Sequence, residues 1–320
     1  MSNREDLYTI LEEEAKDFYL VENIERISKP TPLEFYRDYV SQNRPVIITG
    51  ALDDWDALVK WKDDDYLCEL MKDTKVTVAV TPDGLGDAVK GDLFVKPYEM
   101  KLTFKEYFQL LDNQKQCKST KDKRVYYIQY QNDSFNVEFQ NLWKDIKHSN
   151  VSFAKEAFGL ESDAVNFWMG GNESVSSLHK DPYENIYCVV RGSKLFTLIP
   201  PIDYPFLYEK EYKSATYDKD MNIQIDEPPM NVPWIPVDPC QSLEVNESLG
   251  YLEIKRAHPL HIQVNEGEIL YLPSLYYHRV AQYSPTNKTI AINYWFDMKY
   301  GLNYVYFQFL KEYHKQNQKQ

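Results

Sequence analysis

The chain has 320 residues, of which 43% are hydrophobic and 27% charged, a composition typical of a folded globular protein with one large domain or two smaller ones. Its 36 basic and 49 acidic residues give a formal net charge of -13, which argues against nucleic-acid binding, because that affinity depends on neutralising phosphates with Lys and Arg. A basic protein or peptide fits this charge better as a partner.

The N-terminal part predicts two consecutive helices. Residues 3–28 carry an apolar stripe at helical spacing, formed by Leu7, Ile10, Leu11, Ala15 and Phe18. The second helix begins after Thr31, since Thr31 can cap it, Pro32 suits the first helical position, and Glu34 completes a capping box.

Mixed elements follow up to about residue 150. We expect a short strand over 43–48, one or two helices over 53–71 and a strand over 75–80. The segment from Gly84 to Val89 has two of the three glycines of a dinucleotide-binding loop but no surrounding strand-helix-strand pattern, so it is interpreted as a turn.

From about Asp163 the apolar residues alternate with period 2 in short runs separated by Gly, Pro and Asn. Many short strands at such intervals predict a β-sandwich or barrel. Residues 300–315 form a last helix with an apolar stripe, which can pack inward or pair with another subunit; inward packing is the default expectation.

The most concentrated group of candidate functional residues is His179 and Asp181 in the β-rich half, joined by His278 after the apolar run that ends at Pro273. Residues 179 and 181 project to one side of a strand, so an imidazole and a carboxylate can hold the same cation. A second imidazole from a neighbouring strand gives the two-His, one-carboxylate facial triad of non-haem Fe(II) oxygenases. A buried His bonded to a nearby Asp has the same short pattern, so the motif alone leaves both interpretations open.

Lys194 is a second candidate, because it begins the apolar strand run that ends at Ile199. It is interpreted either as a strand-end charge that reaches water or as the anchor for a carboxylate of a dicarboxylic cosubstrate. Asn185, six residues after His179, and Asn293, in the apolar run 290–295, are further candidate site residues. By contrast, His258 and His261 are expected to have only turn and strand-edge roles, because no carboxylate lies near them at a suitable spacing.

The runs AVNFWMGGNESVSSLHKDPYENIYCVVRGSKLFTLIPP, GEILYLPSLYYHRV and TIAINYWFDM resemble the jumonji-C family of 2-oxoglutarate oxygenases, and the similarity covers nearly the whole chain. The resemblance implies an α+β, mainly β fold: a double-stranded β-helix, which is a cupin-like jelly roll. Its core is expected at 126–298, with an N-terminal α/β region at 1–125 packed on it and a C-terminal helix and polar tail at 299–320.

Carried over by position, the resemblance implies that His179, Asp181 and His278 are the iron ligands and catalytic residues. It implies that Lys194 binds the 2-oxoglutarate cosubstrate, with further contacts from the side chains Tyr127, Ser176, Asn185 and Asn293. Choosing Tyr127 over Tyr126 depends on strand alternation. Fe(II), 2-oxoglutarate and O2 are therefore the expected cofactors and cosubstrates.

Within the family, the chain is similar to a small hydroxylase group, which implies hydroxylation of a protein lysine at C3 in a GTP-binding protein of the developmentally regulated type. The alternatives are histone-lysine demethylation by the same iron chemistry, histone-tail endopeptidase activity, and a non-enzymatic cupin-like binding module. No chromatin-reader segment supports demethylation, and no nucleophile or metalloprotease motif supports proteolysis. A homodimer is one arrangement that the C-terminal stripe allows.

The expected location is the cytoplasm, with the nucleus as a further site. No stretch approaches the roughly 20 apolar residues of a membrane helix, and the residues MSNREDLYTILEEEAKDF lack the apolar core of a secretion signal. The four cysteines, Cys68, Cys117, Cys188 and Cys240, match no zinc pattern and are expected to be free thiols in a reducing compartment.

Overall fold

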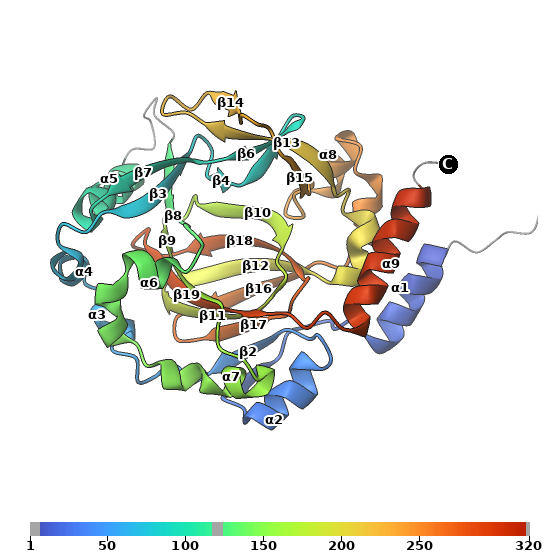
Figure 1. The fold of residues 1–320 in the computed structure, drawn as a ribbon, viewed down its shortest axis with the longest axis horizontal. Helices are drawn as coiled ribbons and strands as arrows, with labels where there is room; N and C mark the ends of the chain where they lie inside the picture. The colour runs from blue at the N-terminus through green and yellow to red at the C-terminus, as the bar shows by residue number, and fades with distance from the viewer. Residues whose placement is uncertain (1–6, 117–123, 318–320) are drawn as a thin grey trace, which may run out of the picture.

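The computed structural model describes residues 7–116 and 124–317, so Cys117 lies outside the described residues. Two β-sheets lie at the centre of the molecule, with helices around them and a third sheet above them in the view of Figure 1. This arrangement confirms the prediction of an α+β, mainly β, cupin-like jelly roll.

The largest sheet has nine strands in the order β1-β2-β17-β11-β19-β9-β8-β3-β7. Their bounds are β1 Arg26–Ser28, β2 Val46–Thr49, β17 Ile269–Leu272, β11 Tyr183–Arg191, β19 Thr289–Asp297, β9 Ala164–Gly170, β8 Val125–Ile128, β3 Val76–Thr81 and β7 Tyr98–Leu102. Strands from the N-terminal part thus extend both edges of a sheet whose centre is formed by the β-rich half.

A five-stranded sheet lies against it, in the order β16-β12-β18-β10-β4. Its strands are β16 Leu260–Asn265, β12 Ser193–Ile199, β18 Tyr277–Tyr283, β10 Val175–Lys180 and β4 Leu85–Gly86. Apolar residues of both sheets share one core, including Val189 and Leu270 from the large sheet and Phe196 and Val280 from the smaller one. Burying these side chains between two sheets is what closes a jelly roll around an interior.

The third sheet has the order β14-β13-β6-β5, and a further strand, β15, pairs with β13. Its strands are β5 Ala88–Lys90, β6 Leu93–Lys96, β13 Lys210–Tyr217, β14 Ile223–Ile225 and β15 Asn231–Trp234. The segment 84–89 interpreted as a turn therefore contributes two short strands, because β4 pairs in parallel with β10 and β5 pairs with β6. The turn itself is the bend at Asp87 between them.

The helices cover the outer face of the large sheet and one end of the jelly roll. The α-helices are α1 Leu7–Phe18, α2 Pro32–Phe35, α3 Ala57–Lys60, α4 Asp64–Met71, α5 Phe104–Gln116, α6 Ser134–Glu138, α7 Ser152–Phe158, α8 Leu243–Ser248 and α9 Leu302–Asn317. A π-helical turn, η1 Tyr36–Val40, follows α2, and four 3-10 turns are η2 Gln140–Asp145, η3 His148–Val151, η4 Pro201–Phe206 and η5 Leu252–Arg256. The Thr31 capping box forms as predicted, with Thr31 and Glu34 bonding each other's backbone amides.

The two terminal helices depart from the predictions. The first helix ends at Phe18, and residues 26–28 form strand β1 instead of continuing it. Helices α1 and α9 lie side by side (Figure 1), with the Tyr8 hydroxyl 3.0 Å from His314 Nδ1. Inward packing of the predicted α9 stripe is wrong for Leu302, Val305, Tyr306 and Phe309, which are at least 58% exposed, whereas Leu310 and Tyr313 are half-buried. Phe307, which lies outside that stripe, is buried.

Candidate metal centre and cosubstrate pocket

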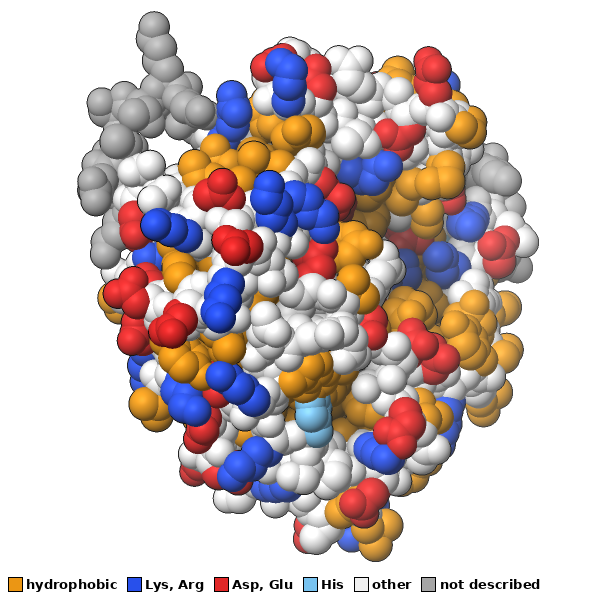
Figure 2. Space-filling model, turned by 60° about the vertical axis from the view of Figure 1, so that its left-hand side comes forward, with side chains coloured by type: hydrophobic (Ala, Val, Ile, Leu, Met, Phe, Trp, Pro, Cys, Tyr) orange, Lys and Arg blue, Asp and Glu red, His pale blue; other side chains and the backbone are white. Residues whose placement is uncertain are grey.

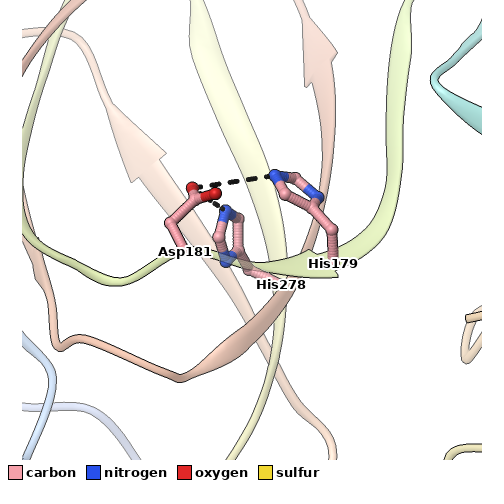
Figure 3. Close-up of side chains that lie close together, drawn as sticks. All are labelled: His179, Asp181 and His278. Carbon is pink, nitrogen blue, oxygen red and sulfur yellow. Dashed lines mark ion pairs between the residues drawn. The ribbon is translucent and has the colours of Figure 1, made fainter. Parts of the chain in front are cut away.

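Two antiparallel strands bring the three candidate metal ligands together. In the register of β10 with β18, His179 lies opposite His278, and Asp181 follows the end of β10. One ligand atom from each side chain lies within 4.8 Å of the other two. Figure 3 shows the carboxylate of Asp181 and both imidazole rings converging on one point between the strands.

Backbone carbonyls orient both imidazole rings. His179 Nδ1 lies 2.7 Å from the Ser177 carbonyl oxygen, and His278 Nδ1 lies 3.0 Å from that of Tyr276. A carbonyl only accepts, so each Nδ1 donates this hydrogen bond, and Nε2 is the ring nitrogen left to bind an ion. Each Nε2 faces Asp181, with Nε2 to Oδ2 distances of 3.8 Å for His179 and 3.6 Å for His278.

This donor set fits a divalent transition metal. The two Nε2 to carboxylate distances are too long for direct hydrogen bonds, as expected where an ion belongs between the groups. Burial lowers the pKa of His278 to about 4, so its ring is neutral near pH 7 and needs no deprotonation before it binds an ion. Two imidazoles and one carboxylate on one side of an ion leave the opposite positions free for other ligands.

A cavity of about 290 Å³ lies between the sheets beside this centre. Its wall includes the triad and four of the predicted cosubstrate contacts, namely Tyr127, Ser176, Asn185 and Asn293. Tyr127 faces inward on β8, as strand alternation predicts, and its side chain is 5% exposed. Trp168 and Trp295 complete part of the wall.

Lys194 lies behind Tyr127 and is fully buried, with 0% exposure. Its Nζ donates to the Tyr127 hydroxyl at 3.1 Å and to Gln282 Oε1 at 2.5 Å. Among the residues that the structure describes, it has no carboxylate partner. The interpretation of Lys194 as a strand-end charge that reaches water is therefore wrong, and desolvation lowers its pKa to about 7.

The two asparagines form one network on the large sheet. Asn293 Nδ2 donates to Asn185 Oδ1 at 3.1 Å, and Asn293 Oδ1 accepts from Trp168 Nε1 at 2.7 Å. Asn185 lies on β11, Asn293 on β19 and Trp168 on β9, which are neighbouring strands of the same sheet. The network holds polar side chains at the cavity wall that are at most 5% exposed.

Several pocket residues were not identified from the sequence. Asp87 lines the cavity from the bend between β4 and β5, and burial raises its pKa to about 6. Trp234 on β15 lies over His179, with ring centroids 5.7 Å apart and ring planes 4° apart. Neither residue stands in a recognisable motif, because pairing between distant strands places both.

A second histidine, His258, has a carboxylate partner after all. Its backbone amide and its Nδ1 lie 2.6 and 3.0 Å from the buried carboxylate of Asp203. The hydrogen bond to Asp203 raises the pKa of His258. The expectation that it lacks a nearby carboxylate is wrong, since Asp203 arrives from η4, 55 positions away. His261, on β16, lies 3.0 Å from the Thr197 hydroxyl.

Comparison with known proteins agrees with this geometry. A family model described as a cupin-like domain matches residues 32–302. With this match and relatives named for a JmjC domain, the chain belongs to the cupin-like JmjC family, whose members generally use Fe(II) and 2-oxoglutarate.

Three relatives illustrate the range of this family. "JmjC domain-containing protein E" of Dictyostelium discoideum is 58% identical, with 96% of this chain and 93% of the relative aligned. "Bifunctional peptidase and (3S)-lysyl hydroxylase JMJD7" of Homo sapiens is 44% identical over 88% of this chain and 86% of its own length. "Lysine-specific demethylase JMJ32" of Arabidopsis thaliana is 40% identical over 93% and 88%.

Proposed function

We propose that this protein is an Fe(II)- and 2-oxoglutarate-dependent oxygenase that hydroxylates a lysine side chain of another protein at C3. The observation that carries the proposal is the convergence of His179, Asp181 and His278 beside a cavity lined by Tyr127, whose hydroxyl accepts from the buried Lys194. A structural His–Asp pair would show a direct hydrogen bond between a ring nitrogen and the carboxylate, and it would need neither a third ligand nor a cavity.

Each part of the site has a task in this reaction. His179, Asp181 and His278 would hold Fe(II), and the carbonyls of Ser177 and Tyr276 keep both rings in the binding tautomer. When bound, the iron with 2-oxoglutarate and O2 supplies the oxidising power to hydroxylate a C–H bond, with succinate and CO2 as coproducts.

The cosubstrate would lie along the cavity toward Lys194. Its distal carboxylate would receive hydrogen bonds from the Lys194 ammonium and the Tyr127 hydroxyl, which already contact each other. Ser176 and the Asn185–Asn293 pair would add polar contacts from two other strands. Trp168 and Trp295 add aromatic surface to the wall of the cavity.

Lysine is proposed as the substrate because the human relative, at 44% identity, is named a (3S)-lysyl hydroxylase. A GTP-binding protein of the developmentally regulated type is the proposed target, as the family resemblance implies. The Arabidopsis relative is named a lysine-specific demethylase, so demethylation of a lysine is the alternative that the test must separate.

The test is mass spectrometry of candidate basic proteins incubated with the protein, Fe(II), 2-oxoglutarate and O2. The expected result is a lysine that gains the mass of one oxygen, located at C3 by fragmentation and absent with His179→Ala. Loss of a methylene mass from methylated lysine would favour demethylation. Cleaved peptides that form equally well with His179→Ala would contradict the oxygenase proposal.

The distribution of charge on the surface supports a protein partner. Acidic and basic side chains are interspersed on the face shown in Figure 2, which agrees with a protein partner better than with nucleic acid. Within the described residues, no helix has both the length and the apolar character needed to cross a bilayer. We propose the cytoplasm, and also the nucleus, as the location.

Homodimerisation is proposed through the outer faces of α1 and α9. Apolar side chains from these adjacent helices are at least half exposed, namely Leu7, Phe18, Leu302, Val305, Tyr306 and Phe309. A second copy of the same face would cover them, because a twofold interface pairs identical patches.

A further inference from the structure

Asp87 occupies the bend between β4 and β5, at the wall of the candidate active site. Its φ angle is 51°, in the left-handed region that residues other than glycine seldom adopt. A residue held in this conformation requires surrounding contacts that fix it, and such residues concentrate at functional sites.

Hydrogen bonds from Ser177 and Gln129 hold the bend in place. The Ser177 hydroxyl on β10 donates to the Asp87 carbonyl oxygen at 2.6 Å, and Trp234 Nε1 on β15 donates to that hydroxyl at 3.0 Å. Gln129, after β8, donates through Nε2 to Asp87 Oδ2 at 3.3 Å. Gly86 makes room for this amide, since a Cβ there would lie 2.4 Å from Gln129 Oε1.

The carboxylate of Asp87 has no ion-pair partner within residues 7–116 and 124–317. The titratable groups that act on it are His179, Glu99 and Lys96. Of these, His179 is a proposed metal ligand, Lys96 is already paired with Asp226 at 2.9 Å, and Glu99 is acidic. A carboxylate that is partly desolvated and lacks a cation is poorly stabilised by the protein alone, so a cationic ligand group would complete it.

Aromatic rings line the same side of the cavity. Trp234 lies parallel to His179, and Phe94 packs on Trp234 with ring centroids 4.6 Å apart. Both aromatic side chains and Asp87 line the cavity. A flat apolar wall that ends near an acid suits an alkyl chain with a terminal ammonium group, which is the form of a lysine side chain.

We propose that Asp87 binds the ε-ammonium group of the substrate lysine, while Trp234 and Phe94 contact its alkyl chain. This assignment rests on the proposed oxygenase function and adds a specificity-determining residue to it. The ammonium group donates hydrogen bonds to the carboxylate, so an unmodified lysine is favoured, and an acetylated lysine, which has no charge, is disfavoured.

The assignment also bears on the choice between hydroxylation and demethylation. With its ammonium group held at Asp87, a lysine presents carbons of its alkyl chain to the metal centre. A trimethylated lysine has no N–H to donate to Asp87, and recognition of such groups relies on aromatic cages instead.

The test compares binding of two small probes, Nα-acetyl-L-lysine amide and Nα-acetyl-L-norleucine amide, by ligand-detected NMR at pH 7.5 under anaerobic conditions with Fe(II) and 2-oxoglutarate. The probes differ chiefly in the ammonium group, and binding requires no turnover. The protein should bind the lysine probe about tenfold or more tightly than the norleucine probe. Asp87→Asn, which keeps the shape and removes the charge, should reduce this ratio to about one.

Asp92→Asn is the matched control, because Asp92 is an exposed acid in the neighbouring β5–β6 turn and gives the same change in charge. It should keep the full preference for the lysine probe. Equal affinities for the two probes, a lysine probe that does not bind, or an undiminished preference in Asp87→Asn would overturn the assignment. The metal-to-2-oxoglutarate absorption band, recorded on the same samples, reports on the proposed function separately: its absence would refute the iron site, whatever the probe ratio.

Discussion

Replacing Lys194 with Met is expected to have opposite effects on stability and on cosubstrate binding. Lys194 is fully buried, and its described polar partners are the uncharged Tyr127 hydroxyl and Gln282 amide. Before 2-oxoglutarate binds, its positive charge is therefore a cost to the fold. Met has a similar length and no charge, so the substitution should increase the free energy of unfolding by about 1 to 3 kcal/mol.

The same substitution should weaken 2-oxoglutarate binding. A buried charge-assisted hydrogen bond to the distal carboxylate is lost, and that carboxylate is left unpaired, at a cost of about 2 to 4 kcal/mol. This corresponds to an apparent dissociation constant about 30- to 900-fold higher. Anaerobic titration of the Fe(II) protein with 2-oxoglutarate measures the constant, and chemical denaturation measures the stability.

The affinity for 2-oxoglutarate should also depend on pH. Desolvation lowers the pKa of Lys194 to about 7, and only the protonated form attracts a carboxylate. Affinity for 2-oxoglutarate should therefore be highest below pH 7 and fall as the pH rises above it, by about tenfold per unit at most. This component should be missing in Lys194→Met and intact in Lys213→Met, an exposed lysine on β13. Unchanged affinity in Lys194→Met would refute this role for Lys194.

Three other predictions concern the scaffold and its partners. Asp145→Ala should lower the free energy of unfolding, measured by chemical denaturation, by about 3 kcal/mol, because the buried carboxylate accepts a hydrogen bond from Trp61 Nε1 at 3.0 Å. The control Asp56→Ala, at an exposed acid, should leave the free energy of unfolding almost unchanged. The hydrogen bond to Asp203 raises the pKa of His258, so the stabilisation from this pair is complete below the unfolded pKa of about 6.5 and is lost as the pH rises through the higher folded pKa. The difference in stability between the protein and His258→Gln should therefore shrink as the pH rises above about 6.5, and a constant difference would contradict the pairing. Phe309→Asp, on the exposed face of α9, should convert a homodimer to monomers in sedimentation experiments, and a wild-type protein that is already monomeric at tens of micromolar would refute the dimer.

The strands of the jelly roll could be predicted because their apolar runs are local and strongly periodic. Strands β9, β11, β12 and β16 to β19 all form where alternation places them. Lys194 could be identified as a candidate because it is a polar exception in such a run, and the His179–Asp181 pair because residues two apart project to one side of a strand. The convergence of His179 and Asp181 with His278 depends on the pairing of β10 with β18, which the periodicity of the sequence cannot reveal.

The wall formed by Asp87 and Trp234 could not be predicted, because long-range pairing creates it. Strand β4 has two residues and resembles a turn, and it becomes a strand through pairing with β10, about 90 positions away. Trp234 reaches the cavity because β15 pairs with β13. The exposed stripe of α9 illustrates a different limit: helical periodicity shows that a stripe is apolar but not whether the chain's own core covers it.

In the proposed function, His179, Asp181 and His278 hold a ferrous ion with positions left open for 2-oxoglutarate. Anaerobic addition of Fe(II) and then 2-oxoglutarate to the protein tests it most directly, by visible absorption with His179→Ala as the comparison. We expect a charge-transfer band that appears only when both additions are made and is absent from His179→Ala. A protein that gives no band, or a His179→Ala variant that gives the full band, would contradict it.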